Sequence, residues 1–326
     1  MIPDYPLRFK PFFRRYLWGG RRLETVLGKS IPEGTDYAES WEIADHGPDD
    51  QSVVEAGQLT GTTLGALVQQ FGRSLLGLDY PQSQFPLLFK FLDAQKDLSV
   101  QVHPNDEQAA RLPRPDRGKT EAWVVLAAEP GSRIFAGLRS EVDREMLERE
   151  IEQGTAERCL HSFEPQVGDC ILIPAGTVHA IGRGLVVAEI QQSSDTTFRL
   201  YDWDRVGADG QRRPLHVQQA LDVIDFHAGP AEPALSQETS SRHIERLVSC
   251  DKFVLDRWRF SSDRLCGGDG RCHILVLLEG QIRVERDAAE GTFDAGETML
   301  LPAAAGSVSC APVDSATMLD IYLPEE

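Results

Sequence analysis

The sequence predicts a mainly β protein made of two jelly-roll β-barrels with a few α-helices. Short apolar segments that end at Gly or Pro turns recur along the chain, which is typical of such barrels. The string GDCILIPA at 168–175 returns as GETMLLPA at 296–303, and an apolar strand lies upstream of each copy. This repeat indicates that one kind of barrel is used twice, and 326 residues suit two packed modules.

The N-terminal part is expected to be irregular with short strands, followed by one helix. Residues 1–60 are rich in Gly and Pro and hold extended pieces such as YAESWEIADH. In 62–77 the apolar side chains recur three or four positions apart, as on one face of a helix. Thr62 or Thr63 is the expected N-cap of this helix.

The segment FPLLFKFLDAQKDLSVQVHP is predicted to form strands. Toward its end apolar and polar residues alternate, and a period of two places Ser99, Gln101 and His103 on one face. Further strands are expected over 121–128, 169–176 and 184–194.

The remaining segments predict a division of the chain into three parts. A charged amphipathic helix is expected over 140–158 and a short helix over 213–226. Pro, Ala and Ser are dense in 227–240, and nearly everything after this segment has the pattern of strands. We therefore expect a first domain over 1–226 with N-terminal strands and short helical insertions, a linker over 227–240, and a C-terminal barrel over 241–326.

Composition excludes several classes of partner. The chain has 33 Lys plus Arg against 51 Asp plus Glu, and a formal net charge of -18. Nucleic acids and anionic membranes require basic surfaces, so we expect neither as a partner, whereas a few buried cations can still bind a small anion. No apolar run approaches the roughly 18 residues that span a bilayer, and the N-terminal residues do not have the pattern of a signal peptide. Six scattered cysteines without a CxxC pair favour reduced thiols in a cytoplasmic protein.

The strings SVQVHPND, GKTEAW and PAGTVHAIG together suit a divalent metal ion. Gln101 and His103 share a strand face, Glu121 opens a strand, and His179 follows a turn at a strand end. Two imidazoles, one carboxylate and one amide oxygen make a mixed nitrogen and oxygen site for zinc or a similar ion. A single strand histidine is more often structural, so the hypothesis depends on the combination.

The repeat predicts a metal in one barrel only. The string G-D-x-x-x-x-P-x-G-x-x-H at 168–179 resembles the second sequence motif of the cupins, which ends on a histidine. The copy that begins at Gly296 has no histidine at the matching position. We therefore expect a metal-binding, catalytic cupin domain over 1–226 and a cupin-like barrel without a metal site over 241–326.

Between residues 16 and 205 the sequence resembles the short bacterial form of the type I phosphomannose isomerases. The strings that carry the resemblance are YLWGGRRLETVLGK, FPLLFKFLDAQKDLSVQVHPND, GKTEAW, IPAGTVHAIG and QQSSDTTFRLYDWDR. It implies a zinc-dependent enzyme that interconverts mannose 6-phosphate and fructose 6-phosphate, with one Zn²⁺ per chain. The sequence leaves open whether the protein is a monomer or a dimer.

The same resemblance implies roles for individual residues. The family's metal ligands fall on the four residues named above. Its active-site arginine falls on Arg199, the lysine before the metal-binding glutamate on Lys119, and a further active-site glutamate on Glu189. Its phosphate-side residues fall on Ser99 and Lys90.

The chemistry of the implied reaction agrees with these residue types. Moving a proton between C1 and C2 through an enediol requires a base beside the two carbons and a cation for the developing oxyanion. Arg199 would supply a fixed cation for the enediolate or for the phosphate. Lys119 is the preferred base, because nearby cations would leave part of it neutral, and Glu189 is the alternative. Lys119 could instead be a surface lysine and Glu189 part of a structural ion pair. Arg199 could form a salt bridge to Asp202 or Asp204.

The string ESWEIADH is open to more than one interpretation. Glu42 and His46 could be extra metal ligands. The resemblance instead places the string beside the sugar, with Glu42 binding substrate and Trp41 as a wall. Trp18 in YLWGG is expected to cap the sugar, although both tryptophans could belong to the core.

Two other functions are compatible with the sequence. A non-catalytic sugar-phosphate-binding homologue with a regulatory role would be favoured by loss of a metal ligand, Arg199 or Lys119, and all of these are present. Another metal-dependent cupin enzyme, such as an iron dioxygenase or a sugar epimerase, is the second alternative. Metal analysis and a coupled assay with mannose 6-phosphate would separate the three.

Overall fold

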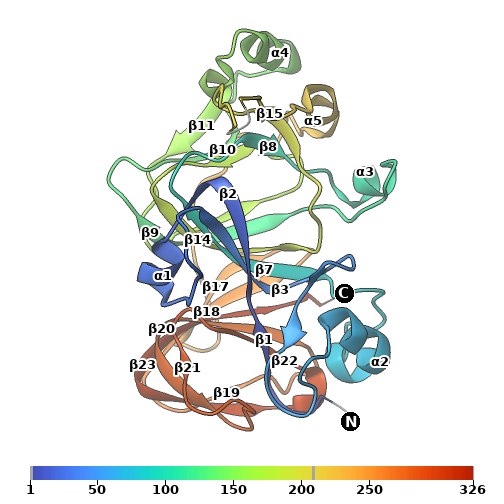
Figure 1. Ribbon diagram of the computed structural model, residues 1–326, viewed down its shortest axis with the longest axis vertical. Helices are drawn as coiled ribbons and strands as arrows, with labels where there is room; N and C mark the ends of the chain where they lie inside the picture. Colours follow the sequence, from blue (N-terminus) through green and yellow to red (C-terminus); the bar gives the residue numbers. More distant parts are fainter. Residues whose placement is uncertain (1–2, 208–209, 326) are drawn as a thin grey trace.

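The computed structural model describes residues 3–207 and 210–325, which form two β-rich halves stacked along the long axis of the molecule (Figure 1). The upper half in this view holds the green and yellow strands. The lower half holds the red strands of the C-terminal part together with the first strand of the chain. The predicted mainly β fold with a few helices is therefore confirmed.

A six-stranded antiparallel sheet lies in the upper half, next to the boundary between the halves. Its central strands are buried along their whole length, because both faces of the sheet are covered. In order across the sheet the strands are β12 (Cys170–Ile173), β9 (Glu121–Ala128), β14 (Leu185–Gln192), β7 (Leu87–Ala94), β3 (Tyr37–Ile43) and β2 (Phe12–Gly20).

A five-stranded antiparallel sheet faces the inner side of the six-stranded sheet. Apolar side chains of both sheets, among them Trp123, Val187 and Ile181, form one core cluster between them. Two antiparallel sheets packed face to face are the arrangement of a jelly roll. The strands in order are β11 (Leu160–Phe163), β10 (Ile134–Leu138), β13 (His179–Ile181), β8 (Val100–Val102) and β15 (Phe198–Tyr201).

A ten-stranded sheet makes up the lower half and encloses its own apolar cluster, which includes Trp258, Leu275 and Phe293. The strands β4 (Asp45–His46) and β5 (Asp50–Gln51) pair with each other in a separate two-stranded sheet. The main path of the large sheet runs β16 (Gln237–Glu238), β17 (Ile244–Ser249), β18 (Val254–Phe260), β23 (Val308–Tyr322), β20 (His273–Val284), β22 (Thr298–Leu301), β1 (Leu7–Lys10) and β6 (Val53–Val54), with β19 (Arg264–Cys266) on β23 and β21 (Phe293–Asp294) on β20.

The two copies of the sequence repeat fold alike locally, since β12 and β22 occupy matching positions in them. The N-terminal strand, however, crosses between the halves. Leu7 in β1 is the Cα partner of Leu300 in β22, and Phe9 is the partner of Val54. The domain boundaries expected from the sequence remain a prediction. In the structure β1 pairs with the C-terminal strand β22, and β6 extends the same sheet by pairing with β1.

One apolar core connects the halves. Alternate side chains of the six-stranded sheet, such as Phe89 and Phe91, point away from the five-stranded sheet and cluster with Phe253 and Ile321 of the lower half. The outer face of the upper barrel is thus buried by the lower one. This arrangement leaves the inward-pointing residues of the same strands free to carry polar groups.

The helices lie at the ends and flanks of the sheets (Figure 1). The second begins at the predicted N-cap, where the Thr63 hydroxyl accepts a hydrogen bond from the amide of Ala66 at 3.2 Å. The two helices expected over 140–158 and 213–226 are shorter in the structure. The helices are α1 (Arg22–Leu27), α2 (Leu64–Leu76), α3 (Asp106–Ala110), α4 (Arg144–Glu152) and α5 (Val217–Val223), with 3₁₀ turns η1 (Ala156–Cys159) and η2 (Ala303–Ala305).

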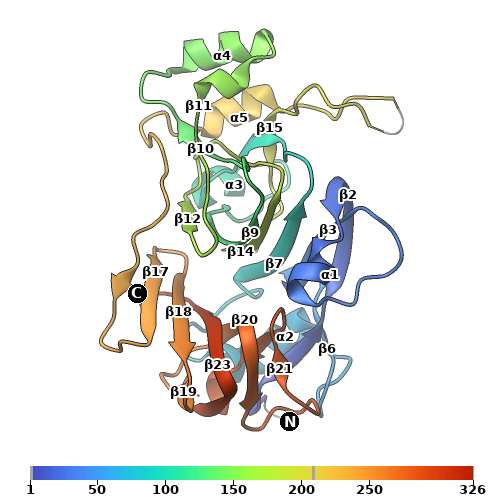
Figure 2. The ribbon, with the colours of Figure 1, turned by 90° about the vertical axis from the view of Figure 1, so that its left-hand side faces the viewer.

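The expected linker runs down the side of the molecule from α5 to β16 (Figure 2). It is attached to the upper barrel by backbone hydrogen bonds from Ala231 to Ala136 and from Ala234 to Cys170. All six cysteines are free thiols, as the sequence predicts. Among the described helices, none is long and apolar enough to cross a membrane.

Candidate active site

A cavity of about 310 Å³ opens between the six-stranded and the five-stranded sheet. Residues two apart on facing strands point into it, so both sheets supply polar side chains. Nine residues singled out in the sequence line this cavity: Trp18, Lys90, Ser99, Gln101, Lys119, Glu121, His179, Glu189 and Arg199.

His103, Glu121 and His179 form a buried cluster at this site. Their potential ligand atoms all lie within 4.8 Å of one another. Glu121 Oε2 lies 3.5 Å from His103 Nε2, and Glu121 Oε1 lies 3.2 Å from His179 Nε2. His179 and Glu121 are the first residues of β13 and β9, and His103 directly follows β8, so rigid strands position all three.

Backbone carbonyls fix the orientation of both imidazoles. His103 Nδ1 lies 2.9 Å from the carbonyl oxygen of Thr196, and His179 Nδ1 lies 2.9 Å from that of Thr177. A carbonyl oxygen can only accept, so each Nδ1 carries the proton and each Nε2 keeps a lone pair. Two imidazole lone pairs and a carboxylate are donors that a divalent metal ion accepts, so the donor set fits a metal ion.

Gln101 lies beside this cluster on β8, as the Cα partner of His179. Its Nε2 is 3.2 Å from His179 Nε2, and its Oε1 accepts a hydrogen bond from Ser99 at 3.4 Å. A half-turn of the amide would exchange the two atoms and present the oxygen to the cluster. The predicted fourth ligand is therefore within reach of the other three.

The Lys119 side chain reaches into the cluster of His103, Glu121 and His179. Its Nζ is 3.1 Å from His103 Nε2, contacts Oε2 of Glu121, and lies 3.9 Å from Oε1 of Glu189. Lys119 therefore points into the cavity, as its spacing from Glu121 predicts. The hypothesis of a neutral lysine assumed cationic neighbours, and the structure places two carboxylates there instead.

Glu189 lies deep in the cavity between two lysines. Its Oε1 is 3.2 Å from Lys90 Nζ, and its Oε2 accepts a hydrogen bond from Trp123 at 3.1 Å. Burial by itself would raise the pKa of Glu189, but Lys90 and Lys119 outweigh it and lower the pKa. Glu189 is thus an ionised carboxylate.

Burial also sets the charges of the metal-binding cluster. It lowers the pKa of His179 to about 4 and, together with Lys119, lowers that of His103 well below its usual value. Burial raises the pKa of Glu121 to about 7, although Lys119 opposes this change. Both imidazoles are therefore neutral at pH 7, which is the form that binds metals.

Lys90 bridges two acids on the floor of the site. Its Nζ lies 3.3 Å from Glu39 Oε1 as well as 3.2 Å from Glu189 Oε1. Burial acts to lower the pKa of Lys90, and the two carboxylates reverse this and raise it. Lys90 is consequently a permanent cation whose charge is balanced by neighbouring side chains.

Arg199 on β15 lines the cavity next to Gln101, its Cα partner. Burial and the nearby Arg213 lower its pKa. Its Nη1 donates to the carbonyl of Pro214 at 3.1 Å, whereas its Nε is buried without a described partner. The alternative of an ion pair with Asp202 does not hold within the described residues, because Asp202 pairs with Arg213 and Arg205.

Glu42 does not lie in this cavity, which corrects the prediction that it binds the substrate. Its Oε1 is 2.7 Å from Lys29 Nζ and accepts a hydrogen bond from Ser40, in a different pocket beside β22. Residues two apart on β3 share a face, so Ser40 and Glu42 point together to one side and Glu39 to the other. Trp41 donates to Glu39 at 2.7 Å from behind the cavity and does not line it.

Four titratable residues that line the cavity were missed in the sequence: Tyr16, Glu39, Asp195 and Arg213. The ring of Tyr16 stacks on that of Trp18 at 5.5 Å, and burial together with Glu39 raises its pKa. Their spacing of two on β2 could have indicated that both point the same way. No such spacing identifies Asp195 or Arg213, because both lie outside the strands and helices.

Comparisons with known proteins agree with this geometry. Residues 7–122 match the family model described as the catalytic domain of type I phosphomannose isomerase. The chain is 37% identical to the mannose-6-phosphate isomerase ManA of Bacillus subtilis over 298 residues, which covers 91% of this chain and 93% of that protein. It is 35% identical to the mannose-6-phosphate isomerase of Streptococcus mutans, over 91% of this chain and 92% of that protein.

The solved structures show the same fold. A crystal structure of the mannose 6-phosphate isomerase from Bacillus subtilis matches with a TM-score of 0.89 and 28% identity, covering 98% of this chain and all of the other. A protein from Archaeoglobus fulgidus described as a mannosephosphate isomerase shares the fold, with a TM-score of 0.76 and 22% identity over 99% of both chains.

Proposed function

Because the chain belongs to the type I phosphomannose isomerases, we propose that it interconverts mannose 6-phosphate and fructose 6-phosphate by proton transfer between C1 and C2 through an enediol. The observation that carries the proposal is the buried cluster of His103, Glu121 and His179 beside the ionised carboxylate of Glu189. Glu121, His179 and Glu189 line one cavity between the sheets, which supports a metal site with a proton acceptor beside it.

We assign the metal site to His103, Glu121 and His179, with Gln101 as the fourth ligand, and the ion to zinc. Two neutral imidazoles, a carboxylate and an amide oxygen are a donor set that zinc accepts. When bound, zinc would act as a Lewis acid toward a sugar oxygen. Strand-borne ligands whose rings are fixed by the carbonyls of Thr196 and Thr177 lose little freedom on binding.

Glu189 is the group that we propose to take the proton from carbon. It lines the cavity, its pKa is lowered by Lys90 and Lys119, and its Oε1 lies 3.2 Å from Lys90 Nζ, so the carboxylate is ionised and held in place. Lys119, with its Nζ 3.9 Å from that oxygen, would stabilise negative charge on the enediolate oxygens. These assignments reverse the preference that the sequence alone suggests, because Lys119 lies beside the carboxylates of Glu121 and Glu189, whereas the hypothesis of a lysine base required cationic neighbours.

The phosphate group of the substrate would bind to Arg199. The guanidinium has donors to spare, since its described hydrogen bond is the one to Pro214, and Arg213 adds a second cation to the cavity wall. Ser99 can donate its hydroxyl proton from the neighbouring strand. The charge of Lys90 is already balanced by Glu39 and Glu189, so we assign Lys90 to positioning Glu189 rather than to binding the phosphate.

Six free thiols support the further proposal of a cytoplasmic protein.

A coupled assay on zinc-loaded protein tests the function. Mannose 6-phosphate is supplied, fructose 6-phosphate is measured, and zinc content is determined by elemental analysis. We expect turnover that a chelator abolishes and zinc restores. Binding of mannose 6-phosphate without turnover would favour the non-catalytic homologue, and bound iron with oxygen consumption would favour a different cupin enzyme.

A further inference from the structure

The segment that carries Lys119 is not part of a strand or a helix. Residues 111–120 lie between α3 and β9 without regular structure, so hydrogen bonds from outside must hold them. The amide of Gly118 donates to Asp106 Oδ1 at 2.8 Å, that of Lys119 to the carbonyl of Pro104 at 3.0 Å, and that of Thr120 to Gln192 Oε1 at 3.1 Å. Three successive amides are thus held from behind the cavity.

Asp106 is the centre of this arrangement. Besides the amide of Gly118, its Oδ1 accepts a hydrogen bond from Gln192 Nε2 at 2.9 Å, while its Oδ2 lies 2.8 Å from Lys252 Nζ. Asp106 is itself held in place as the first residue of α3, whose start is closed by a capping box between Asn105 and Gln108.

Three chain segments meet here, and each carries a residue of the site on its other side. Residues 103–106 carry His103, 118–121 carry Lys119 and Glu121, and 189–192 carry Glu189. The Asp106 carboxylate therefore joins the three segments from which the metal-binding and proton-handling groups extend. Gly118 fits against this junction because a Cβ there would lie 2.5 Å from the amide nitrogen of Asp106.

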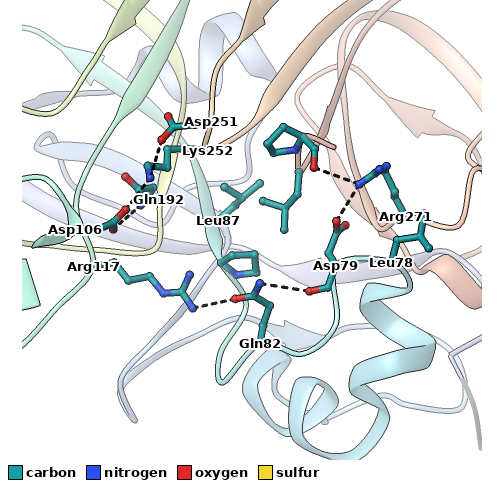
Figure 3. A pocket seen from close by; sticks show the side chains of 13 residues that line it. Leu78, Asp79, Gln82, Leu87, Asp106, Arg117, Gln192, Asp251, Lys252 and Arg271 are labelled. Carbon is teal, nitrogen blue, oxygen red and sulfur yellow. Dashed lines mark hydrogen bonds and ion pairs between the residues drawn. The ribbon is translucent and has the colours of Figure 1, made fainter. Parts of the chain in front are cut away.

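Lys252 links the junction to the C-terminal half. It lies in the turn between β17 and β18 and pairs with Asp106 and, at 2.9 Å, with its neighbour Asp251. Figure 3 shows these residues around a cavity of about 510 Å³ between the halves, with Gln192 next to Asp106. The ion pair between Lys252 and Asp106 thus links the C-terminal barrel to the back of the active site.

We propose that Asp106 is a positioning residue for Lys119: its Oδ1 fixes Gly118 and Gln192 and so holds the Lys119 segment against the metal cluster, and Lys252 braces Asp106 from the C-terminal half. Neither Asp106 nor Lys252 lines the active-site cavity, so both act through other residues. The proposal rests on the proposed function only where activity is measured.

The matched variants Asp106→Ala and Asp106→Asn test the role of this oxygen. Alanine removes the acceptor of both hydrogen bonds, whereas asparagine keeps a carbonyl oxygen in its place. Residues that orient active-site groups typically contribute about 10–100-fold to activity. We expect kcat of Asp106→Ala to fall by this factor with KM within about threefold, and Asp106→Asn to retain most of its activity.

Hydrogen–deuterium exchange provides a readout that does not need activity. The amides of Gly118, Lys119 and Thr120 should exchange faster in Asp106→Ala than in Asp106→Asn or the parent. If the parent protein turns over no sugar phosphate, the proposed function fails, and the exchange data still decide whether Asp106 holds this segment. Equal exchange in the two variants would overturn the proposal.

Lys252 is tested by Lys252→Met, with Lys252→Arg as the rescue and Asp251→Asn as the control. Exposed ion pairs contribute at most about 1 kcal/mol, so we expect kcat of Lys252→Met to fall roughly two- to fivefold. Arginine should restore it, and Asp251→Asn should leave it unchanged, because Asp251 contacts Lys252 without touching Asp106. Wild-type kcat in Lys252→Met, or an equal loss in Asp251→Asn, would remove the brace from the proposal.

Discussion

Glu189 and Lys90 are Cα partners on the neighbouring strands β14 and β7, and the carboxylate Oε1 of one lies 3.2 Å from the ammonium Nζ of the other. Both belong to strands that are buried on each face, so the pair is screened little by solvent. Lys90 therefore keeps Glu189 ionised at a depth where an isolated carboxylate would take up a proton. This ion pair is what suits Glu189 to the proposed role of a base.

The proton-transfer assignment predicts different outcomes for two substitutions. Glu189→Gln should lower kcat by about 10²–10⁴-fold, the usual contribution of a general base. Lys119→Met should also lower kcat, while bound metal is retained in both variants. Steady-state kinetics with elemental analysis measures this. If Glu189→Gln turns over at near the parent rate while Lys119→Met is inactive, Lys119 is the base after all.

The metal assignment predicts that metal and activity are lost together. His103→Ala and His179→Ala each remove one lone pair from the cluster and should bind substoichiometric zinc. His216→Ala is a suitable control, since His216 contacts the backbone of Arg199 and lies outside the metal-binding cluster. Full zinc occupancy in either cluster variant would remove that histidine from the ligand set.

Glu42 is predicted to matter for stability and not for the substrate. Glu42→Ala leaves the ammonium of Lys29 buried without its carboxylate, and breaking a buried pair in this way costs about 3–5 kcal/mol. Denaturant unfolding should show the loss, while KM for mannose 6-phosphate stays within about twofold in the folded fraction. A large rise in KM with unchanged stability would return Glu42 to the substrate site.

His273 predicts a dependence of stability on pH. Its Nδ1 lies 2.7 Å from Asp320 and its Nε2 3.0 Å from Asp269. Burial acts to lower the pKa of His273, but the two carboxylates raise it to about 10. Because the folded pKa is raised, the stabilisation is complete below the unfolded value near 6.5 and is lost as the pH rises toward 10.

Unfolding free energies measured between pH 6 and 10 should therefore fall by a few kcal/mol in the parent protein. His273→Gln, which cannot be protonated, should be less stable at pH 6 and show a flatter profile. Parallel profiles for the two proteins would show that His273 is not the titrating group.

Much of the site follows from strand periodicity. The spacing of Ser99, Gln101 and His103 predicts that their side chains share a face of the strand. Ser99 and Gln101 both line the cavity, which confirms the prediction for these two. Lys119 and Glu121 are brought together as their spacing of two requires. The alternation of a strand fixes which side chains point to the same side, and this was sufficient to predict how these residues lie relative to one another.

The predictions that were wrong or missing depend on contacts between segments that are far apart in the sequence. Glu42 and Glu39 lie on opposite faces of β3, and composition alone does not say which face meets the cavity. Charges around Lys119 depend on Glu189 from a strand far along the chain. The contact between Asp106 and Lys252 joins two halves whose packing no local pattern encodes.

The pairing of Leu7 with Leu300 also has a consequence for biosynthesis. Strand β1 leaves the ribosome well before its partner β22. At roughly 5–20 residues per second, about 15–60 s separate the two. During this interval the edge of β1 that β22 later covers is unpaired, and an unpaired strand edge is a site where other chains can add.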